Sequence, residues 1–470
     1  MSISLAAPAY GRAPSAVHVH ETHWGRFFTF VIVLVWGATH FVGGFQTAIL
    51  ALTLFGLAAA ALGLLHAPLG VLGITVLCLT DAPARVYVMT DGLLPWNTMN
   101  YLMVLVVLAG LPTLLRFRDV HSRLLVVYAL LLGFGVLISP SFGDGVQEVL
   151  TVVAAFGFLY YFARAAMSRE LWYWVGANGA LLTTLMGFAY YQQSAELEYL
   201  NPNAWALTLL GGVFATCLAF PATEGRPLRR AYLLGLFSMA MVWIFLSGSR
   251  GSLLIGLACS LMLLFSLPGL TLRVLAVSVA AIIGIGAASY FGDLQATATH
   301  RLDKLLNRGP AANPELTLSE RTSGRSDLVI GGLYIFRHNP LGVGTGGFPY
   351  AWERLDPEAG ITFARGRQFN AHSGWIKVLA ENGVPATSVL LAWVLSFAVI
   401  GARNRERHRR LLGLATTCAL GLALVSTEFQ PKPLWFLAAG TTVLLSRRGG
   451  PAGSLLPPAL SPPREDDRGV

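Results

Sequence analysis

Long apolar stretches recur along this chain from Phe27 to about Leu445, separated by polar connections. Most of them approach the roughly 20 residues that an α-helix needs to cross the hydrocarbon core of a bilayer. Within each stretch the apolar residues are continuous and do not alternate with polar ones, which favours helices over a membrane β-barrel. Charged residues make up only 12% of the chain, about half the share found in a soluble domain. The sequence therefore predicts an all-α polytopic membrane protein.

The apolar stretches predict about 12–14 transmembrane helices. The expected spans are residues 27–44, 47–65, 68–80, 97–115, 124–140, 148–166, 172–191, 204–221, 231–247, 252–268, 273–292, 383–402, 411–427 and 434–446. Two of these, 68–80 and 434–446, are short and would equally fit re-entrant or paired segments. Residues 1–22 lack the apolar core of a signal peptide, so we expect the first span to direct membrane insertion.

Arginine clusters in alternate connections predict the orientation of the helices. The clusters are Arg116, Arg118 and Arg123; Arg164 and Arg169; Arg226, Arg229 and Arg230; Arg403, Arg405, Arg407, Arg409 and Arg410; and Arg447 and Arg448. Cytoplasmic connections carry an excess of basic residues, so we expect these clusters and both termini to face the cytoplasm. The clusters also explain the formal net charge of +9 better than nucleic-acid binding does.

One connection, residues 293–372, is much longer than the others and is polar, glycine-rich and basic. Long connections are translocated largely regardless of charge, so its arginines are compatible with the opposite, periplasmic face. Residues 326–337 have apolar side chains at helical spacing, and we expect a short helix there that lies against the membrane face. The predicted organisation is a cytoplasmic tail (1–26), a transmembrane bundle (27–292), a periplasmic loop carrying the active site (293–372), C-terminal transmembrane helices (373–447) and a disordered cytoplasmic tail (448–470).

Two arginine motifs are expected on the outer face. Ser-Gly-Ser-Arg-Gly at 247–251 joins two spans, and Arg250 there is costly unless it has an anionic partner. The serines and glycines, Ser249 among them, leave backbone N–H groups available to an anion. An interfacial arginine whose head reaches water is the alternative. In the second motif Arg321 and Arg325 are four residues apart, so they can share a helical face and bind phosphate oxygens, although a solvated polar turn has the same composition.

His372 lies where a polar segment leads into an apolar span, at the expected outer boundary of the membrane. Histidine has a pKa suited to proton transfer near neutral pH, but an ordinary interfacial histidine would occupy the same position. His338 opens the glycine-rich segment 338–347, which lacks the βαβ context of a nucleotide-binding loop. We expect this segment to form a backbone hairpin packed near the site, with His338 ending a helix. Asn203, after Asn-Pro at the start of a span, also fits an ordinary helix cap.

The predicted topology brings residues from distant parts of the sequence to one face of the membrane. Arginines with one histidine, and without a cluster of carboxylates or thiols, indicate chemistry on a phosphorylated substrate with no metal and no cofactor. The four cysteines fall in apolar segments and have neither metal-ligand nor disulfide spacing. The candidate catalytic residues are His372, Arg250 and Arg325, and the candidate substrate-binding residues are Arg321, Asn203, Ser249, His338 and Glu381.

Five short motifs follow one another through the second half of the chain. They are Asn-Pro-Asn at 201–203, Ser-Gly-Ser-Arg-Gly at 247–251, Ser-Gly-Arg-Ser at 323–326, Asn-Pro-Leu-Gly-Val-Gly at 339–344, and His-Ser through Glu-Asn-Gly at 372–383. As an ordered set they resemble the O-antigen ligase/polymerase superfamily of bacterial inner-membrane glycosyltransferases. The resemblance covers about residues 200–383, whereas the first 190 residues match only as hydrophobic helices.

This resemblance implies the multi-helix fold of metal-independent glycosyltransferases that use lipid-linked sugars. It implies a glycan donor on undecaprenyl pyrophosphate at the periplasmic face of the inner membrane, and an acceptor hydroxyl such as that of a lipid A core. Arg250 and Arg325 would bind the pyrophosphate and stabilise its charge as it leaves, with Arg321 as a further ligand. His372 would activate or orient the acceptor hydroxyl, and Glu381 would orient His372 or act structurally.

The sequence leaves the acceptor open. A ligase, a polymerase of lipid-linked glycans and a protein O-oligosaccharyltransferase share these motifs, and we take the ligase as the working hypothesis. Ser373 stands where many relatives have asparagine after the histidine, which weakens any inference about the acceptor. A transporter is the alternative from another class, but the sequence shows neither a mid-membrane relay of acidic residues nor a repeat of broken helices.

Overall fold

The computed structural model describes residues 16–80, 98–115, 119–165, 167–193, 202–247, 249–267, 324–355 and 366–426, residues 432–446, and the single residues 269 and 361. Every regular element in this part of the chain is helical. The elements are α1 (Ala16–Leu62), α2 (Ala67–Thr80), α4 (Thr98–Leu114), α5 (Val120–Leu137), α6 (Phe142–Arg164), α7 (Arg169–Gln193), α8 (Pro202–Ala219), the 3-10 helix η1 (Phe220–Thr223), α9 (Pro227–Leu246), α10 (Arg250–Ser266), α14 (Arg325–His338), α15 (Phe348–Glu353), α16 (Gly374–Ala402), α17 (Arg407–Ser426) and α18 (Lys432–Ser446).

Within the described residues, five helices are long and apolar enough to cross a membrane. They are α5, α6, α8 with its extension to Thr223, α9 and α16. Residues 47–62, α2, α4 and α10 form shorter apolar helices. The protein is therefore an all-α polytopic membrane protein, as the sequence predicted. Each expected span lies on one of the helices except 273–292, which lies outside the described residues, and the full number of spans remains a prediction.

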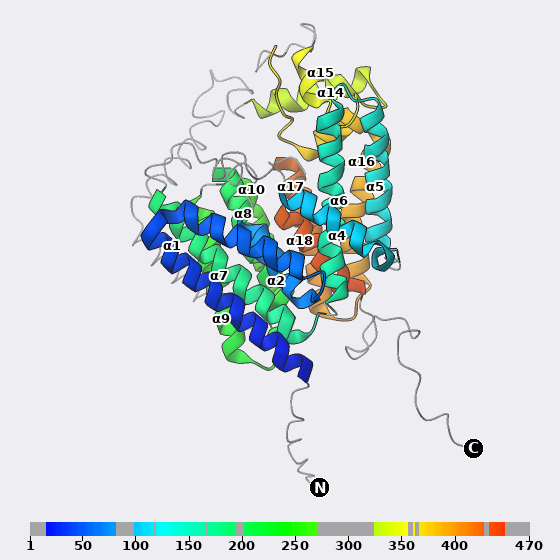
Figure 1. Cartoon of the computed structure of the whole chain (residues 1–470). Helices are drawn as coiled ribbons and strands as arrows, with labels where there is room; N and C mark the ends of the chain where they lie inside the picture. The colour runs from blue at the N-terminus through cyan, green and yellow to red at the C-terminus, as the bar shows by residue number, and fades with distance from the viewer. Residues whose placement is uncertain are drawn as a thin grey trace, which may run out of the picture.

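A single glycine divides α1 into two legs. Gly44 has φ 75° and ψ −176° inside the helix, a backbone conformation that side chains with a Cβ rarely adopt. The second leg folds back beside the first, as Figure 1 shows, and the rings of Phe28 and Phe55 meet at 4.8 Å between centroids. The two expected spans 27–44 and 47–65 correspond to these legs.

The degree of burial separates the central helices from the peripheral ones. In the apolar window of α8, 89% of the residues are buried, against 33% in α9 and 39% in α5 and α16. Helix α5 exposes Leu130, Phe134 and Leu137, which suit contact with lipid in a membrane protein. Helices α2 and α18 are buried along most of their length, so α2, α8 and α18 form the centre of the bundle.

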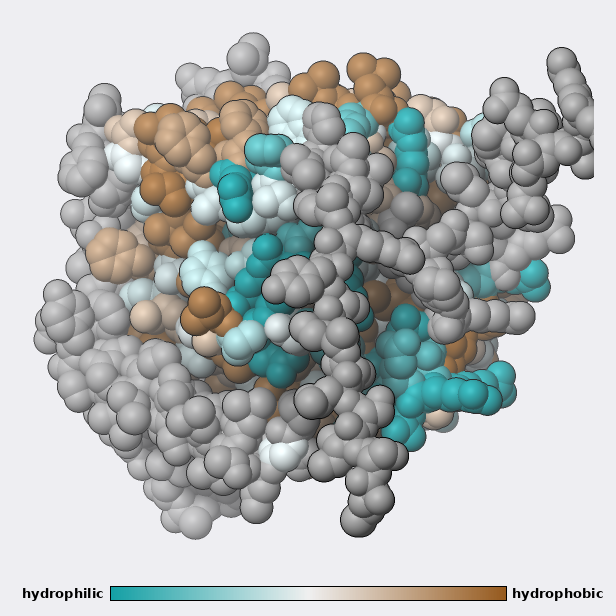
Figure 2. All heavy atoms as spheres, turned by 90° about the horizontal axis from the view of Figure 1, so that it is seen from below, coloured by the Kyte–Doolittle hydropathy of each residue, from teal (hydrophilic) through white to brown (hydrophobic). Residues whose placement is uncertain are grey.

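Four connections that carry predicted arginine clusters, α4–α5, α6–α7, α8–α9 and α16–α17, lie at one end of the bundle, which we call the arginine end. Ser168 bonds to Glu21 in α1, and Arg169 lies 3.6 Å from Glu224 in the α8–α9 connection. His408 Nδ1, at the start of α17, lies 3.2 Å from Ser266 Oγ at the end of α10. Viewed from this end in Figure 2, hydrophilic residues gather near the middle of the face and hydrophobic ones lie towards parts of its margin.

Glu170 connects two of the arginine clusters at this end. Its carboxylate accepts hydrogen bonds from Arg226 and from Arg229, the latter with 2.7 Å between Nη1 and Oε2. Burial of the carboxyl group acts to raise its pKa, but the hydrogen bonds and charges of Arg226 and Arg229 together hold the pKa below its ordinary value. The ion-pair network ties the first turn of α7 to the start of α9.

We expect this network to lose its contribution to stability under acid conditions. A carboxyl whose pKa is lowered by folding stabilises the protein above its unfolded pKa, near 4.5, and that stabilisation is lost as pH falls through the lower, folded value. The unfolding temperature of the wild type should therefore exceed that of Glu170→Gln at pH 7, and the difference should shrink as pH falls below about 4.5. The matched control is Glu224→Gln, which removes an exposed pair with Arg169. A pH-independent difference between wild type and Glu170→Gln would contradict the assignment.

The predicted helix in the long loop is present as α14, two residues longer than the expected 326–337. Leu328, Gly331, Gly332 and Ile335 turn inward and belong to, or lie against, a small separate core with Phe348, Trp352 and Ile361. The opposite face of α14 exposes Val329, Ile330 and Leu333, apolar side chains that suit the expected position against the membrane face. Figure 1 shows α14 and α15 at the end of the bundle remote from the start of α1.

Candidate functional site

Arg250 is the first residue of α10, in the turn that joins α9 to α10. Ser247 Oγ donates to Ile244 O at 2.6 Å, which closes the end of α9, and Ser249 N donates to Ser247 Oγ at 3.2 Å. Ser249 is buried and its hydroxyl lies 3.2 Å from that of Ser252. The side chain of Arg250 is exposed. Arg250 therefore has its guanidinium at the N-terminus of α10.

Arg325 occupies the equivalent position in α14. It is the first residue of that helix, it is exposed, and it follows Gly324 in the left-handed conformation with φ 78°. Helix N-termini carry unsatisfied N–H groups and a partial positive charge. Both candidate cations thus add their charge to a helix end that already favours anions. The sequence analysis named both arginines as candidates but did not place both at helix starts.

The contacts of α17 bring Arg250 and His372 to the same end of the bundle. Helices α10 and α17 pack together, and the start of α17 touches the end of α10 through His408 and Ser266. The two helices are therefore antiparallel, and the start of α10 lies near the end of α17. That end also receives the segment after His372, because Ser373 Oγ donates to Leu424 O at 3.2 Å. We call this the loop end; α14 packs on α16 there.

His372 has a strained backbone. Its φ is 48°, and only one other described residue besides glycine, Met167, has a positive φ. The imidazole is exposed and meets the ring of Phe369 edge to face, with 5.3 Å between centroids. Strained backbones persist where the surrounding structure fixes them and are concentrated at functional sites. Here the histidine is held at the loop end by its neighbour Ser373, which is bonded to α17, and by the first turn of α16.

The glycine-rich segment forms a turn that binds to two helices. Gly344 N donates to Glu381 O at 2.8 Å on α16, and Thr345 N donates to Gly135 O at 3.1 Å on α5. Thr345 Oγ1 is also 2.7 Å from Asn382 Oδ1. The turn is therefore a structural clamp between α5 and α16, in agreement with the expected backbone hairpin. It adjoins Gly383, where φ is 67° and α16 bends.

Gly344 should be intolerant of any side chain. A Cβ there would come within 2.5 Å of the backbone of Ser139, and its φ of 95° is unfavourable for residues other than glycine. Gly344→Ala should destabilise the protein by at least about 1–3 kcal/mol from strain alone, measured as a lower unfolding temperature. Gly366→Ala is the matched control, because Gly366 has a φ of 71° but open space around it. Equal losses in the two variants would contradict the close packing of the turn.

The structure also joins two charged residues that the sequence analysis did not connect. The ammonium group of Lys377 on α16 forms an ion pair with Glu148 on α6, and both side chains are largely buried. Tyr350 OH donates to Asp144 Oδ2 at 3.0 Å one turn earlier on α6. Lys377 is one of three lysines in an arginine-rich chain, and it precedes an apolar run. That was the signal in the sequence that it has a buried acidic partner.

Part of the chain matches a known protein family. Residues 234–391 match a family model described as O-antigen ligase. This segment, about a third of the chain, is similar to the O-antigen ligase family. No match to the chain is found among curated proteins. The O-antigen ligase segment includes both helix-start arginines, His372 and the glycine-rich turn, so the family match and the loop end coincide.

The remaining candidate residues have different surroundings. Glu381 is buried, and its Oε1 accepts a hydrogen bond of 3.0 Å from Phe348 N, which gives it a role in holding the turn. His338 is exposed at the end of α14, with Nδ1 2.9 Å from Tyr334 O, as expected for a residue that ends a helix. Arg321 and the side chain of Asn203 lie outside what the structure describes. Substrate contact by each of these four residues remains a prediction.

Proposed function

We propose that this protein transfers a glycan from a polyprenyl pyrophosphate lipid, of the undecaprenyl type, to an acceptor hydroxyl at the periplasmic face. The acceptor under this proposal is a lipid A core, and the reaction needs no divalent metal. The observation that carries the proposal is that the O-antigen ligase segment contains two arginines at helix starts together with a histidine. These are groups suited to a pyrophosphate and to a hydroxyl proton, respectively.

The charges of the site suit a leaving pyrophosphate. Arg250 and Arg325 each combine a guanidinium, which binds phosphate oxygens in bidentate geometry, with the partial positive charge of a helix N-terminus. As the bond between the anomeric carbon and the pyrophosphate oxygen breaks, negative charge grows on that oxygen. Fixed cations aimed at developing charge lower the barrier, because they need no reorganisation during the reaction.

His372 is the general base in this mechanism. The acceptor hydroxyl attacks the anomeric carbon, its oxygen forms the new glycosidic bond, and its proton passes to the imidazole of His372. The electron pair of the broken bond leaves with the polyprenyl pyrophosphate. An exposed imidazole held by a constrained backbone is suited to this transfer, since a general base must be presented in a fixed position.

The proposal is tested by glycan transfer with the purified full chain in nanodiscs. The donor is an undecaprenyl-pyrophosphate oligosaccharide, chelator is present throughout, and lipid A core, a second lipid-linked glycan and a serine-containing acceptor protein are offered in parallel. We expect transfer to lipid A core and a loss of about 10²-fold in Arg250→Gln, the usual effect of removing one electrostatic contact to the transition state. Arg403→Gln, an exposed arginine at the arginine end, is the matched control.

Each outcome of this assay bears on a separate part of the proposal. Transfer to the second glycan or to the protein would replace the acceptor and keep the chemistry. Transfer that stops in chelator would overturn metal independence. A donor that neither binds nor reacts, together with flux of a solute into sealed vesicles that contain the protein, would replace the enzyme with a transporter.

A further inference from the structure

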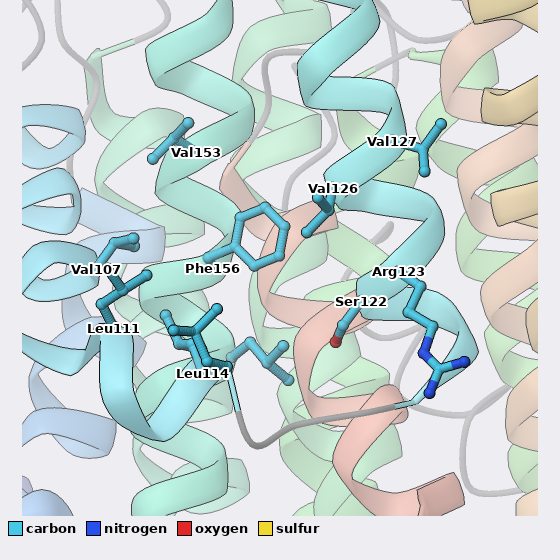
Figure 3. Close-up of a pocket in the computed structure, with 11 residues that line it drawn as sticks. Val107, Leu111, Leu114, Ser122, Arg123, Val126, Val127, Val153 and Phe156 are labelled. Atoms are coloured by element: carbon cyan, nitrogen blue, oxygen red, sulfur yellow. The ribbon is translucent and has the colours of Figure 1, made fainter.

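Helices α4, α5 and α6 enclose a groove far from the loop end. Its volume is about 630 Å³, within the usual range of about 300–1,000 Å³ for ligand pockets. Figure 3 shows α4 and α5 as its two walls, with Val153 and Phe156 of α6 between them. The lining residues are Val107, Leu111, Leu114, Leu115, Ser122, Arg123, Val126, Val127, Val153, Phe156 and Leu159.

The chemistry of the lining is apolar along the groove and basic at one end. Only Ser122 and Arg123 carry polar side chains, and the hydroxyl of Ser122 already donates to the carboxylate of Asp119. Arg123 is exposed, and no ion pair joins it to a carboxylate within the described part of the chain. A ligand that fits this groove therefore combines a hydrocarbon chain with an anionic group.

The groove lies towards the arginine end of the bundle. Arg123 is in the first turn of α5, where His121 Nδ1 lies 2.7 Å from Ser396 Oγ near the end of α16. The connection before α5 adds Arg116 and Arg118 in the sequence, against the single acidic residue Asp119. Membrane leaflets on the cytoplasmic side are rich in anionic lipids, and basic pockets between helices bind their headgroups.

We propose that this groove binds an anionic membrane phospholipid from the leaflet at the arginine end. One acyl chain lies between α4 and α5 against Val153 and Phe156, and the headgroup phosphate pairs with Arg123. This site is separate from the loop end, where the lipid-linked donor is proposed to bind, and it does not depend on the glycan-transfer proposal. The bound lipid would hold α4 and α5 together across an otherwise open groove.

The test uses phosphatidylglycerol that carries a diazirine in one acyl chain, with phosphatidylcholine of the same chains as the comparison. The full-length protein is purified in detergent, titrated with each lipid, irradiated and digested, and the labelled peptides are identified by mass spectrometry. We expect phosphatidylglycerol to label α4, α5 and α6, and to bind more tightly than phosphatidylcholine. Arg123→Gln should lower the affinity for phosphatidylglycerol about fivefold, which is the contribution of one arginine at an anionic surface. Arg403→Gln is its control.

A second variant tests the apolar part of the site. Val126→Trp fills the groove and should abolish labelling of these helices, whereas Leu257→Trp places the same bulk on an exposed position of α10 and should not. If Val126→Trp lowers the unfolding temperature, Val126→Phe is used in its place. Labelling that persists in the filled variant, or equal binding of the two lipids, would overturn the proposal.

Discussion

His372→Ala should reduce glycan transfer by about 10²–10⁴-fold, the range expected when a general base is removed. The histidine is exposed, its backbone is held at φ 48°, and Ser373 fixes the following turn to α17. The loss should fall on the rate constant of the chemical step, because the proposed pyrophosphate contacts are made by the arginines. The measurement is single-turnover transfer from saturating lipid-linked donor in nanodiscs.

Two controls separate a catalytic role from a structural one. His66→Ala removes an exposed histidine in the α1–α2 connection and should leave the transfer rate unchanged. His372→Gln retains a polar side chain, so it should preserve folding and donor binding while still losing transfer. If His372→Gln transfers at the rate of the wild type, proton transfer by His372 is wrong. If donor binding falls with the rate, His372 acts as a ligand of the donor.

Lys377→Met should destabilise the folded protein by about 3–5 kcal/mol, because it leaves a buried charge without its partner. Lys377 is 8% exposed and Glu148 is 20% exposed, so water compensates the remaining carboxylate poorly. The buried carboxyl of Glu381 lies one helical turn from Lys377 and interacts with its charge. Lys377→Met would remove that positive charge from the surroundings of Glu381 as well. The measurement is the free energy of unfolding in detergent, or the unfolding temperature where unfolding is irreversible.

The double variant Lys377→Met/Glu148→Gln is the decisive comparison. It removes both charges, so it should be more stable than Lys377→Met alone. Glu224→Gln breaks an exposed pair with Arg169 and should cost no more than about 1 kcal/mol. A double variant that is less stable than Lys377→Met would show that Lys377 does not stabilise the protein through its ion pair with Glu148. The same variants assayed for transfer would show whether the pair also positions the loop end.

Local sequence patterns were sufficient to predict most helices of this protein. A backbone in lipid must satisfy its hydrogen bonds internally, so a long apolar stretch leaves little choice but a helix. The same reasoning, with the positions of the arginines, placed the four connections of the arginine end together. The expected helix at 326–337 followed from helical periodicity and was found as α14. The roles of Arg250, Arg325 and His372 came from an ordered set of short motifs, and they remain predictions.

Only the tertiary structure decided how the loop end is assembled. Lys377 and Glu148 are 229 residues apart, and Thr345 and Leu132 are 213 apart. No local pattern encodes such pairs, because they depend on which helix faces lie against each other. The left-handed backbone of His372 and the placement of both arginines at helix starts arise in the same way. Hydrophobic length and charge therefore determined which segments are helices in the membrane, while packing between distant helices determined which polar groups meet.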